Sequence, residues 1–460
     1  MKSSRSLDVG GKSVLIYTMG IEGRDLARWM VAQGAIVTMS DTRTEAQLAA
    51  AGATTPTGVS RLVCGEPLLD AEGFELVATG QSVLRHNPAI VRARKLGIPC
   101  VSQMELFLDL CPAPVIGITG ASGKSTTTAL VGAMAAAAGL NPVLGGNLGE
   151  ALLGRLSDIL PGSTVVLEIS HTQLQYTTRS PRIAAVTNVT PNHLDQFSWD
   201  EYVGLKRNIL LHQGSDDIAV LNADDHTSRQ FVAEAKGQVL RTSIKGEIQG
   251  NGAWFEADKV RVRYGGRAQA VVHRSQVRLR GEHNLANVTM ACAIAAAAGF
   301  PIAAMTSAIE AFRGIPHRLE VVGRALGATW VNDSIATSPE RTVAGLNAFT
   351  EPVVLLLGGR EKRLPLDLLQ RTAAARCRAV ICFGEAGELF YEALRGVIGQ
   401  VRPTSSLSDA IELATALVQP GDAVLLSPAG TSFDAFPSFE ARGQAFRDLV
   451  RALPGFEEVV

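Results

Sequence analysis

GITGASGKSTTTAL, residues 117–130, decides how the middle of the chain folds. The apolar run that ends at Gly120 predicts a strand, and the pattern that begins at Lys124 predicts a helix. The glycines between them permit tight turns that point backbone N–H groups at phosphate oxygens. The sequence therefore predicts an ATP-binding loop formed by Gly120, Gly123, Lys124, Ser125 and Thr126.

Within this loop, Lys124 supplies a positive charge for the β- and γ-phosphates, and the Ser125 hydroxyl can ligate Mg²⁺. The common pattern G-x-x-x-x-G-K-[ST] requires glycine at position 118, where the chain has isoleucine. The loop reads T-G-x-x-G-K-S instead, so the kind of ATP-binding protein has to be identified from the rest of the chain.

Outward from the loop, apolar runs of strand length alternate with helical patterns along the whole chain. Prolines near residue 113 and the segment around Gly314 interrupt this alternation. We therefore predict an α/β fold with three open, mostly parallel-sheet domains. The first and last are Rossmann-like and the middle one is ATPase-like, and they span residues 1–111, 112–314 and 315–460.

The composition excludes several classes of protein. Hydrophobic residues make up 46% of the 460 residues and charged residues 19%, and the formal net charge is -1, which provides no broad basic surface for nucleic acid. The six cysteines lack C-x-x-C and zinc-site spacing, which predicts buried thiols in a reducing, cytoplasmic compartment. No signal peptide is recognised, and Gly299 and Pro301 divide the uncharged stretch Val288–Ile309 into two helices rather than a membrane insertion.

Seven further blocks of sequence accompany the loop. They are LEISHTQLQ (167–175), TNVTPNHLDQF (187–197), YVGLKRNIL (202–210), GEHNLANV (281–288), IPHRLE (315–320), VNDSIATSP (331–339) and LSPAGTSFDAFPSFEARG (426–443). With the variant loop they resemble the Mur ligase family, whose members use ATP to convert a carboxylate into an acyl phosphate that an amine then attacks. The folylpolyglutamate synthetases share this kind of loop, but the last block argues against a folate substrate.

The resemblance implies roles at the ATP site. Glu168 and His193 would bind metal together with Ser125, and both follow buried strands, where ligand sites of α/β proteins form. Lys206 would react with CO₂ to give a carbamate that bridges toward one of two Mg²⁺ ions. Spacing alone would make Lys206 an ordinary solvated helix lysine. Lys124, Glu168, His193 and Lys206 would thus be the catalytic residues.

Further roles follow from the remaining blocks. Asn284 and Asn287 share a helix face that would meet adenine, although Asn284 also suits a helix N-cap. Arg318 would reach a phosphate and Asp333 the ribose hydroxyls. The incoming glutamate would be held by Thr337, Lys362, Ser432 and Phe439.

The first domain resembles the unit with which the family binds a UDP-linked substrate. Gly20 and Gly23 follow the first strand. A dinucleotide-binding pattern would require glycine at position 18, where Thr18 stands, so NAD binding is disfavoured. The residues implied to hold this substrate are Asp41, Thr42, Arg43, Asn147, Ser170 and Gln173.

Three departures from the family pattern stand out. The S-P-G of the first domain is Thr79-Gly80-Gln81, the lysine of N-D-S-K is Ile335, and the cysteine of S-P-A-C is Gly430. Arg360 and Arg363 flank Lys362 and would resupply positive charge near Ile335.

The resemblance implies a monomeric ATP-dependent ligase of peptidoglycan precursor synthesis. It would add glutamate, D- in preference to L-glutamate, to UDP-N-acetylmuramoyl-L-alanine through an acyl phosphate. One alternative is a family member that uses L-glutamate or another amino acid. Another is a non-catalytic ATP-binding regulator, against which the intact Lys124, Glu168, His193 and Lys206 argue.

Overall fold

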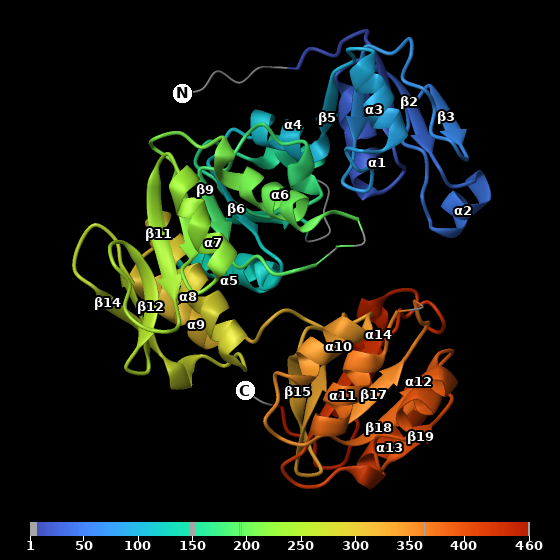
Figure 1. Cartoon of the computed structure of the whole chain (residues 1–460), viewed down its shortest axis with the longest axis vertical. Helices are drawn as coiled ribbons and strands as arrows, with labels where there is room; N and C mark the ends of the chain where they lie inside the picture. Colours follow the sequence, from blue (N-terminus) through green and yellow to red (C-terminus); the bar gives the residue numbers. More distant parts are fainter. Residues whose placement is uncertain (1–6, 148–151, 193, 195, 363, 459–460) are drawn as a thin grey trace. The chain divides into compact units, whose positions relative to one another are not determined.

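A computed structural model describes residues 7–147, 152–192, 194, 196–362 and 364–458 of the chain. Contacts between residues divide the chain into two compact units, and Figure 1 labels their helices and strands. Unit 1 comprises Met1–Val277 and Glu282–Ala311, and unit 2 comprises Arg278–Gly281 and Phe312–Val460.

The first sheet of unit 1 has five parallel strands in the order β3-β2-β1-β4-β5. The strands are β1 (Ser13–Tyr17), β2 (Ile36–Asp41), β3 (Arg61–Cys64), β4 (Leu76–Thr79) and β5 (Cys100–Ser102), and the helices are α1 (Ile21–Ala32), α2 (Glu45–Ala50), α3 (Pro88–Lys95) and α4 (Gln103–Leu110). Alternate residues of β1 enter two different apolar clusters, because successive strand side chains point to opposite faces.

The second sheet of unit 1 has nine strands in the order β14-β13-β12-β11-β10-β9-β6-β8-β7. The strands are β6 (Val115–Thr119), β7 (Pro142–Gly146), β8 (Thr164–Glu168), β9 (Ile183–Val186), β10 (Ile218–Asn222), β11 (Gln238–Ser243), β12 (Gly252–Glu256), β13 (Lys259–Arg263) and β14 (Gln269–His273). The helices are α5 (Lys124–Ala137), α6 (Trp199–Leu211), α7 (His226–Gln230), α8 (Glu282–Ala297) and α9 (Ile302–Ala311). Helix α5 packs against α8 and α9, and α6 packs against β6 and β9.

Strand–helix alternation, predicted throughout, is wrong between β11 and β14. These four strands follow one another, and β12–β13 and β13–β14 pair antiparallel. The reason is a turn in which Ala257 and Asp258 have φ of 47° and 57°, the left-handed conformation that reverses a hairpin. The alternating polar and apolar residues of β13 suit a half-buried strand.

The two sheets of unit 1 share part of their apolar core. One cluster runs from Val14 and Ile16 of the first sheet through Phe107 of α4 to Val165 and Leu167 of the second. The first predicted domain boundary, 111/112, therefore falls inside one compact unit, between α4 and β6.

Unit 2 has six strands in the order β15-β16-β20-β17-β18-β19, all parallel except for the antiparallel pair β15–β16. The strands are β15 (Glu320–Ala325), β16 (Ala328–Asn332), β17 (Val353–Gly358), β18 (Cys377–Phe383), β19 (Val401–Pro403) and β20 (Ala423–Ala429). The helices are α10 (Pro339–Leu346), α11 (Asp367–Arg376), α12 (Gly387–Leu394), α13 (Leu407–Leu417) and α14 (Phe439–Arg451). Apolar residues of α10, α11 and α12 cover one face and those of α13 and α14 the other (Figure 1).

The predicted α/β class with three mostly parallel sheets is confirmed. The second predicted boundary, 314/315, lies close to the change of unit at Ala311/Phe312. The alanine-rich stretch forms α8 and α9 with a break at Gly299, as the sequence indicated. Among the described residues, no helix combines the length and the apolar character needed to cross a bilayer.

Candidate active site

The phosphate loop joins β6 to α5 in unit 1. Gly120 and Gly123 have φ of 149° and 81°, a region that favours glycine. A Cβ at Gly120 would lie 1.9 Å from Thr187 Oγ1, and one at Gly123 would lie 2.1 Å from Asn287 Oδ1. Both glycines are thus required by conformation and by close packing. The loop leads directly into the N-terminus of α5, and a helix N-terminus favours the binding of phosphate.

The loop is anchored to the end of β9. Thr187 Oγ1 donates to Ser122 O at 2.6 Å, and Asn188 Oδ1 accepts from Ser122 N at 3.0 Å. Lys124 begins α5, and its Nζ donates to Ala121 O at 3.3 Å. The predicted loop residues therefore lie together, with Ser125 half-buried and Thr126 buried in the first turn of α5.

Lys206 lies beneath this loop. It is 1% exposed, because Tyr202, Leu205, Lys206 and Ile209 form the buried face of α6. Its Nζ donates to Gly120 O at 2.7 Å and to Thr119 Oγ1 at 3.4 Å. Burial lowers the pKa of the amine well below its ordinary value, nearby Lys124 lowers it further, and Glu168 opposes the shift. The interpretation of Lys206 as a solvated lysine is wrong.

Glu168 ends β8, directly beside β6 and the start of the loop. It is 2% exposed, and its Oε1 accepts from Asn147 Nδ2 at 2.9 Å. Its Oε2 is buried and has no hydrogen-bond partner among the described residues. A buried carboxylate oxygen left without a donor fits a divalent cation, which supplies the missing positive charge.

Of the predicted metal ligands, His193 lies outside the described residues. Within the described part of the chain, no three His, Cys, Asp or Glu side chains gather into a cluster that could hold a metal. A cation at Glu168 would therefore depend on ligands beyond such a cluster, such as the Ser125 hydroxyl and phosphate oxygens.

The predicted adenine face also lies at the loop. Asn287 is buried on α8, at the point where Gly123 comes closest. Its Nδ2 donates to Asn284 Oδ1 at 3.1 Å, so the two amides form one surface one helical turn apart.

In the first sheet, Asp41 and Arg43 form a closed pair at the end of β2. Arg43 Nε donates to Asp41 Oδ1 at 2.8 Å and Arg43 Nη2 to Oδ2 at 2.7 Å, while Met19 N donates to Oδ2 at 2.7 Å. Burial alone would raise the pKa of Asp41, but these bonds hold it below its ordinary value. The exposed Thr42 lies between the paired residues.

The turn after β1 differs from the dinucleotide-binding pattern in its first glycine position. Thr18, in the position where that pattern has glycine, has a φ of 82°. A Cβ at Gly23 would lie 1.9 Å from Thr18 O, so α1 starts against the turn only because residue 23 is glycine.

The predicted substrate residues Asn147, Ser170 and Gln173 lie between the two sheets of unit 1. Gln173 Nε2 donates to Glu22 Oε1 at 2.6 Å, and Glu22 Oε2 accepts from Gln81 N at 2.5 Å. Burial raises the pKa of Glu22, although both bonds oppose this. The sequence did not indicate Glu22 as a site residue, and it marked Gln81 only as a departure from the family pattern. No spacing in the sequence shows that the loops carrying these residues meet.

In unit 2, predicted glutamate-binding residues lie at the carboxyl ends of β16, β20 and β17, which are neighbours in the sheet. Lys362 Nζ donates to Thr337 Oγ1 at 3.2 Å. Ser432 is buried, and the preceding Thr431 pairs with Arg360 through two backbone hydrogen bonds of 2.8 Å. These contacts draw the loops that carry Lys362 and Ser432 together.

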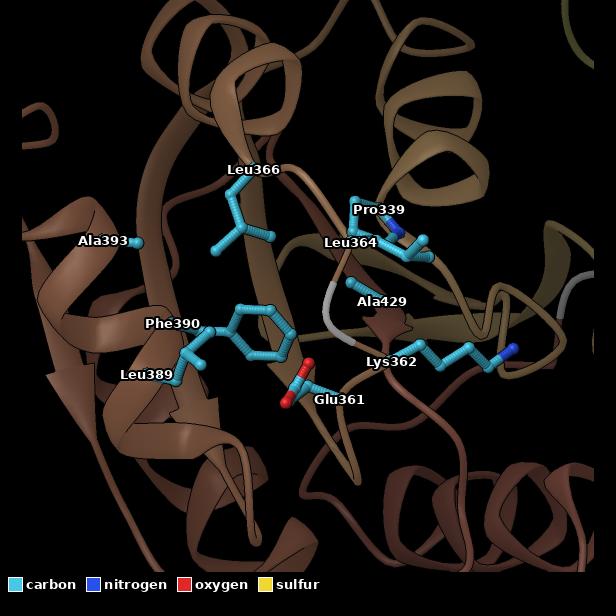
Figure 2. A pocket seen from close by; sticks show the side chains of 9 residues that line it. All are labelled: Pro339, Glu361, Lys362, Leu364, Leu366, Leu389, Phe390, Ala393 and Ala429. Atoms are coloured by element: carbon cyan, nitrogen blue, oxygen red, sulfur yellow. The ribbon is translucent and has the colours of Figure 1, made fainter. Parts of the chain in front are cut away.

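Behind Lys362 lies a cavity of about 250 Å³. Its lining is mostly apolar: Pro339, Leu364, Leu366, Leu389, Phe390, Ala393 and Ala429, with Glu361 and Lys362. Figure 2 shows the Lys362 side chain extending away from the apolar side chains. The Lys362 amine thus points toward Thr337 rather than toward the apolar side chains of the cavity.

Asp333 is buried in unit 2. Its Oδ1 accepts from Leu319 N at 3.2 Å and its Oδ2 from Ser427 Oγ at 2.8 Å. Burial raises its pKa to about 7, while Arg318 lies near enough to oppose that shift. The Phe439 ring meets the His317 ring edge-on, with centroids 6.4 Å apart.

The structure shows which groups surround two of the three departures from the family pattern, Ile335 and Gly430. At Ile335, Arg341 Nη1 donates to the backbone carbonyl at 3.1 Å, so Arg341 is the cation beside this position. The expectation that Arg360 resupplies the charge is not met, because Arg360 Nη2 pairs with Glu385 Oε2 at 2.9 Å. Arg363 lies outside the described residues.

Gly430 is required by close backbone packing. A Cβ there would lie 2.6 Å from Gly358 O and 3.0 Å from Arg360 O. The carbonyl of Gly430 accepts from Arg442 Nη2 at 3.1 Å, and Arg442 is fully buried. The family cysteine would not fit between these segments without a shift of the loop.

Comparison with known proteins gives matches over nearly the whole chain. A model of the Mur ligase middle domain matches residues 118–295, and a model of the Mur ligase glutamate ligase domain matches residues 317–430. UDP-N-acetylmuramoylalanine–D-glutamate ligase from Symbiobacterium thermophilum is 40% identical over 449 residues, which cover 95% of this chain and 97% of the relative. The protein of the same name from Clostridium novyi is 36% identical, over 97% of this chain and 98% of the relative.

Solved structures match at the level of the fold. UDP-N-acetylmuramate-alanine ligase from Thermotoga maritima gives a TM-score of 0.55 at 18% identity, over 95% of this chain and 98% of that one. A pseudomurein peptide ligase type C from Methanothermus fervidus gives 0.54 at 16% identity, over 96% and 99% of the two chains.

Proposed function

The chain belongs to the Mur ligase family, and from this premise we propose that it is an ATP-dependent ligase acting on UDP-N-acetylmuramoyl-L-alanine. The reaction joins the alanine carboxylate to the amine of D-glutamate in peptidoglycan precursor synthesis. The names of the relatives from Symbiobacterium thermophilum and Clostridium novyi support this substrate pair.

The proposed reaction has two steps. The alanine carboxylate attacks the γ-phosphorus of ATP, which releases ADP and leaves an acyl phosphate. The glutamate amine attacks the acyl carbon, the amide forms, and phosphate leaves as the amine loses a proton. The loop from Gly120 to Ser125 would hold the ATP phosphates with backbone N–H groups and with Lys124, so positioning and charge neutralisation supply the catalysis.

One observation carries the proposal: two buried ionisable side chains, Lys206 and Glu168, meet the phosphate loop from below. A carboxylate oxygen without a donor and an amine with a strongly lowered pKa are costly unless they serve a ligand. When bound, Mg²⁺ would neutralise the charge that builds up between ATP and the carboxylate. Glu168 and Ser125 would hold one such ion, and His193 is proposed for a second on the resemblance.

Lys206 is proposed to carry the carbamate. The neutral amine attacks CO₂ and releases one proton, and the lowered pKa enlarges the neutral fraction. Intact-protein mass after gentle bicarbonate equilibration should show one added CO₂ on the native chain and none on Lys206→Met. A native protein without the adduct, together with an active Lys206→Met variant, would return Lys206 to a structural role.

On the amino-acid side, Thr337, Lys362, Ser432 and Phe439 are proposed to hold glutamate, since its two carboxylates need donors. Arg318 is proposed for a phosphate and Asn284 with Asn287 for adenine. The ribose contact of Asp333 stays a prediction, because both of its oxygens already accept hydrogen bonds. Free thiols on all six cysteines support a reducing, cytoplasmic location, and we propose a monomer.

The test is phosphate release from ATP with a panel of substrates. Release should require both UDP-N-acetylmuramoyl-L-alanine and D-glutamate, with L-glutamate as the matched arm. Turnover with L-glutamate but not with D-glutamate would assign the chain to another branch of the family. Release with diaminopimelate or lysine in place of glutamate would do the same, and binding of ATP without turnover on any pair would indicate a regulator.

A further inference from the structure

Gln81 stands at a position where the family pattern has no side-chain amide. It follows β4 in the first sheet, and the family's S-P-G is Thr79-Gly80-Gln81 here. Its side chain crosses to the second sheet. Gln81 Oε1 accepts from Ser170 Oγ at 2.8 Å and from Thr172 Oγ1 at 3.1 Å, and Gln81 Nε2 donates to Asn147 Oδ1 at 3.3 Å.

The chain of hydrogen bonds continues to the buried carboxylate. Asn147 Nδ2 donates to Glu168 Oε1 at 2.9 Å, and Asn147 N donates to Glu168 O at 2.9 Å. This route ends at the carboxylate whose other oxygen, Oε2, lacks a donor among the described residues. One side chain of the first sheet thus reaches the candidate metal ligand through a single intermediate.

The donors and acceptors allow one direction only. A metal-binding carboxylate accepts and cannot donate, so Asn147 must turn its NH₂ group toward Glu168 and its oxygen toward Gln81. Gln81 must then donate to that oxygen with its own NH₂ group. The remaining oxygen of Gln81 faces two hydroxyls, both of which can donate. Each amide is therefore held in one orientation by its neighbours.

We propose that Gln81 is a positioning residue for the metal site: it fixes the Asn147 amide and, through it, the Glu168 carboxylate, so that Oε2 stays available to a divalent cation beside the phosphate loop. The inference rests on the proposed function for the identity of the cation. Residues that orient metal ligands from one step away commonly change metal affinity or activity by about 10- to 100-fold when they are replaced.

The measurement uses nucleotide binding rather than turnover. Calorimetry gives the Kd of a non-hydrolysable imido analogue of ATP, once with Mg²⁺ and once with EDTA. The ratio of the two Kd values is the Mg²⁺ coupling factor of each variant. Mg²⁺ also neutralises charge on the free analogue, but this effect is the same for every variant and cancels when their coupling factors are compared. Gln81→Ala should lose about tenfold in this factor, while its Kd in EDTA stays within about twofold of the native value.

Gln81→Glu is the second variant and is nearly isosteric. Its carboxylate cannot donate to Asn147 Oδ1, so the Asn147 amide is expected to rotate its NH₂ group toward the new acceptor. That rotation turns the Asn147 oxygen toward Glu168. The coupling factor should fall at least as far as in Gln81→Ala, although the side-chain volume is kept.

Gln175→Ala is the matched control. Gln175 also links the first sheet to the second, since its Nε2 donates to Val83 O and its Oε1 accepts from Arg85 N at 2.7 Å, and these bonds lie apart from the route that joins Gln81, Asn147 and Glu168. It should keep the native coupling factor. An unchanged factor in both Gln81 variants, or an equal loss in Gln175→Ala, or an equal loss of affinity in EDTA, would overturn the inference. Failure of the proposed function would show separately, as absent phosphate release by the native protein.

Discussion

Replacing Gly123 with alanine tests how closely the phosphate loop and the adenine face are coupled. The new Cβ would lie 2.1 Å from Asn287 Oδ1 and 3.1 Å from Asn287 Cγ. Nonbonded heavy atoms rest roughly 3.5 Å apart, so the Asn287 side chain has to move by about 1 Å or more. That movement breaks the 3.1 Å hydrogen bond from Asn287 to Asn284.

Two costs add up in this variant. An alanine at the φ of 81° observed for Gly123 costs about 1–2 kcal/mol as a left-handed residue. The lost Asn287–Asn284 bond costs about 1 kcal/mol more. Gly139 offers a matched control within the same helix region, because it has a φ of 79° and nothing lies within 4 Å of its Cβ position. Gly139→Ala therefore carries the first cost alone.

The assay pairs urea unfolding with binding of the ATP analogue. Gly123→Ala should be less stable than Gly139→Ala by about 1 kcal/mol, and it should bind the analogue at least about tenfold more weakly, because the displaced Asn287 no longer presents its amide. Gly139→Ala should bind like the native protein. If the two variants matched each other in stability and in affinity, the contact between the loop and α8 would not bear on nucleotide binding.

Three further changes have defined outcomes. Lys124→Ala should abolish phosphate release and leave the urea midpoint nearly unchanged, because the Lys124 side chain is not part of the buried core; native-like release would refute the ATP-site assignment. Asp333, with a folded pKa of about 7 against an ordinary 3.8, holds its proton more tightly when folded, so its contribution to stability is present at low pH and is lost as pH rises toward 7. Unfolding measured from pH 4 to 8 should show the native protein losing stability relative to Asp333→Asn, and parallel curves would refute the assignment. Gly430→Cys, which restores the family residue, should destabilise unit 2, because its Cβ would lie 2.6 Å from Gly358 O; an unchanged melting temperature would contradict that packing.

The sequence predicted those features that depend on local pattern. The strand, turn and helix around Gly120 and Lys124 follow from apolar periodicity and glycine placement, and the structure has β6 and α5 there. The hairpins of β12–β14 were missed for two different reasons. Ala257-Asp258, between β12 and β13, is an unusual pair for a left-handed turn, whereas Gly265-Gly266, between β13 and β14, is a signal from which that hairpin could have been predicted.

The site was predicted in its membership but not in its contacts. The burial of Lys206 depends on which face of α6 meets β6 and β9, and a lone lysine within an amphipathic pattern gives no sign of it. The link from Gln81 to Asn147 joins residues 66 apart in sequence, on loops of two different sheets. Such pairs are decided by tertiary packing, which no local pattern records.

The three departures from the family pattern share a physical property, since each is matched by a neighbouring group. Ile335 removes a cation, and Arg341 brings one to the same backbone carbonyl. Gly430 removes a side chain where the Gly358 carbonyl approaches too closely for any Cβ. Gln81 adds an amide, and that amide finds three partners around Asn147 and Ser170. These neighbouring groups keep the loops packed, and the unpaired buried atom beside them is Arg442 Nη1, next to Gly430, which lacks a hydrogen-bond partner among the described residues. The presence of Lys124, Glu168 and Lys206 favours a working ligase over a regulator that merely retains the fold, and the three departures from the family pattern lie outside these residues.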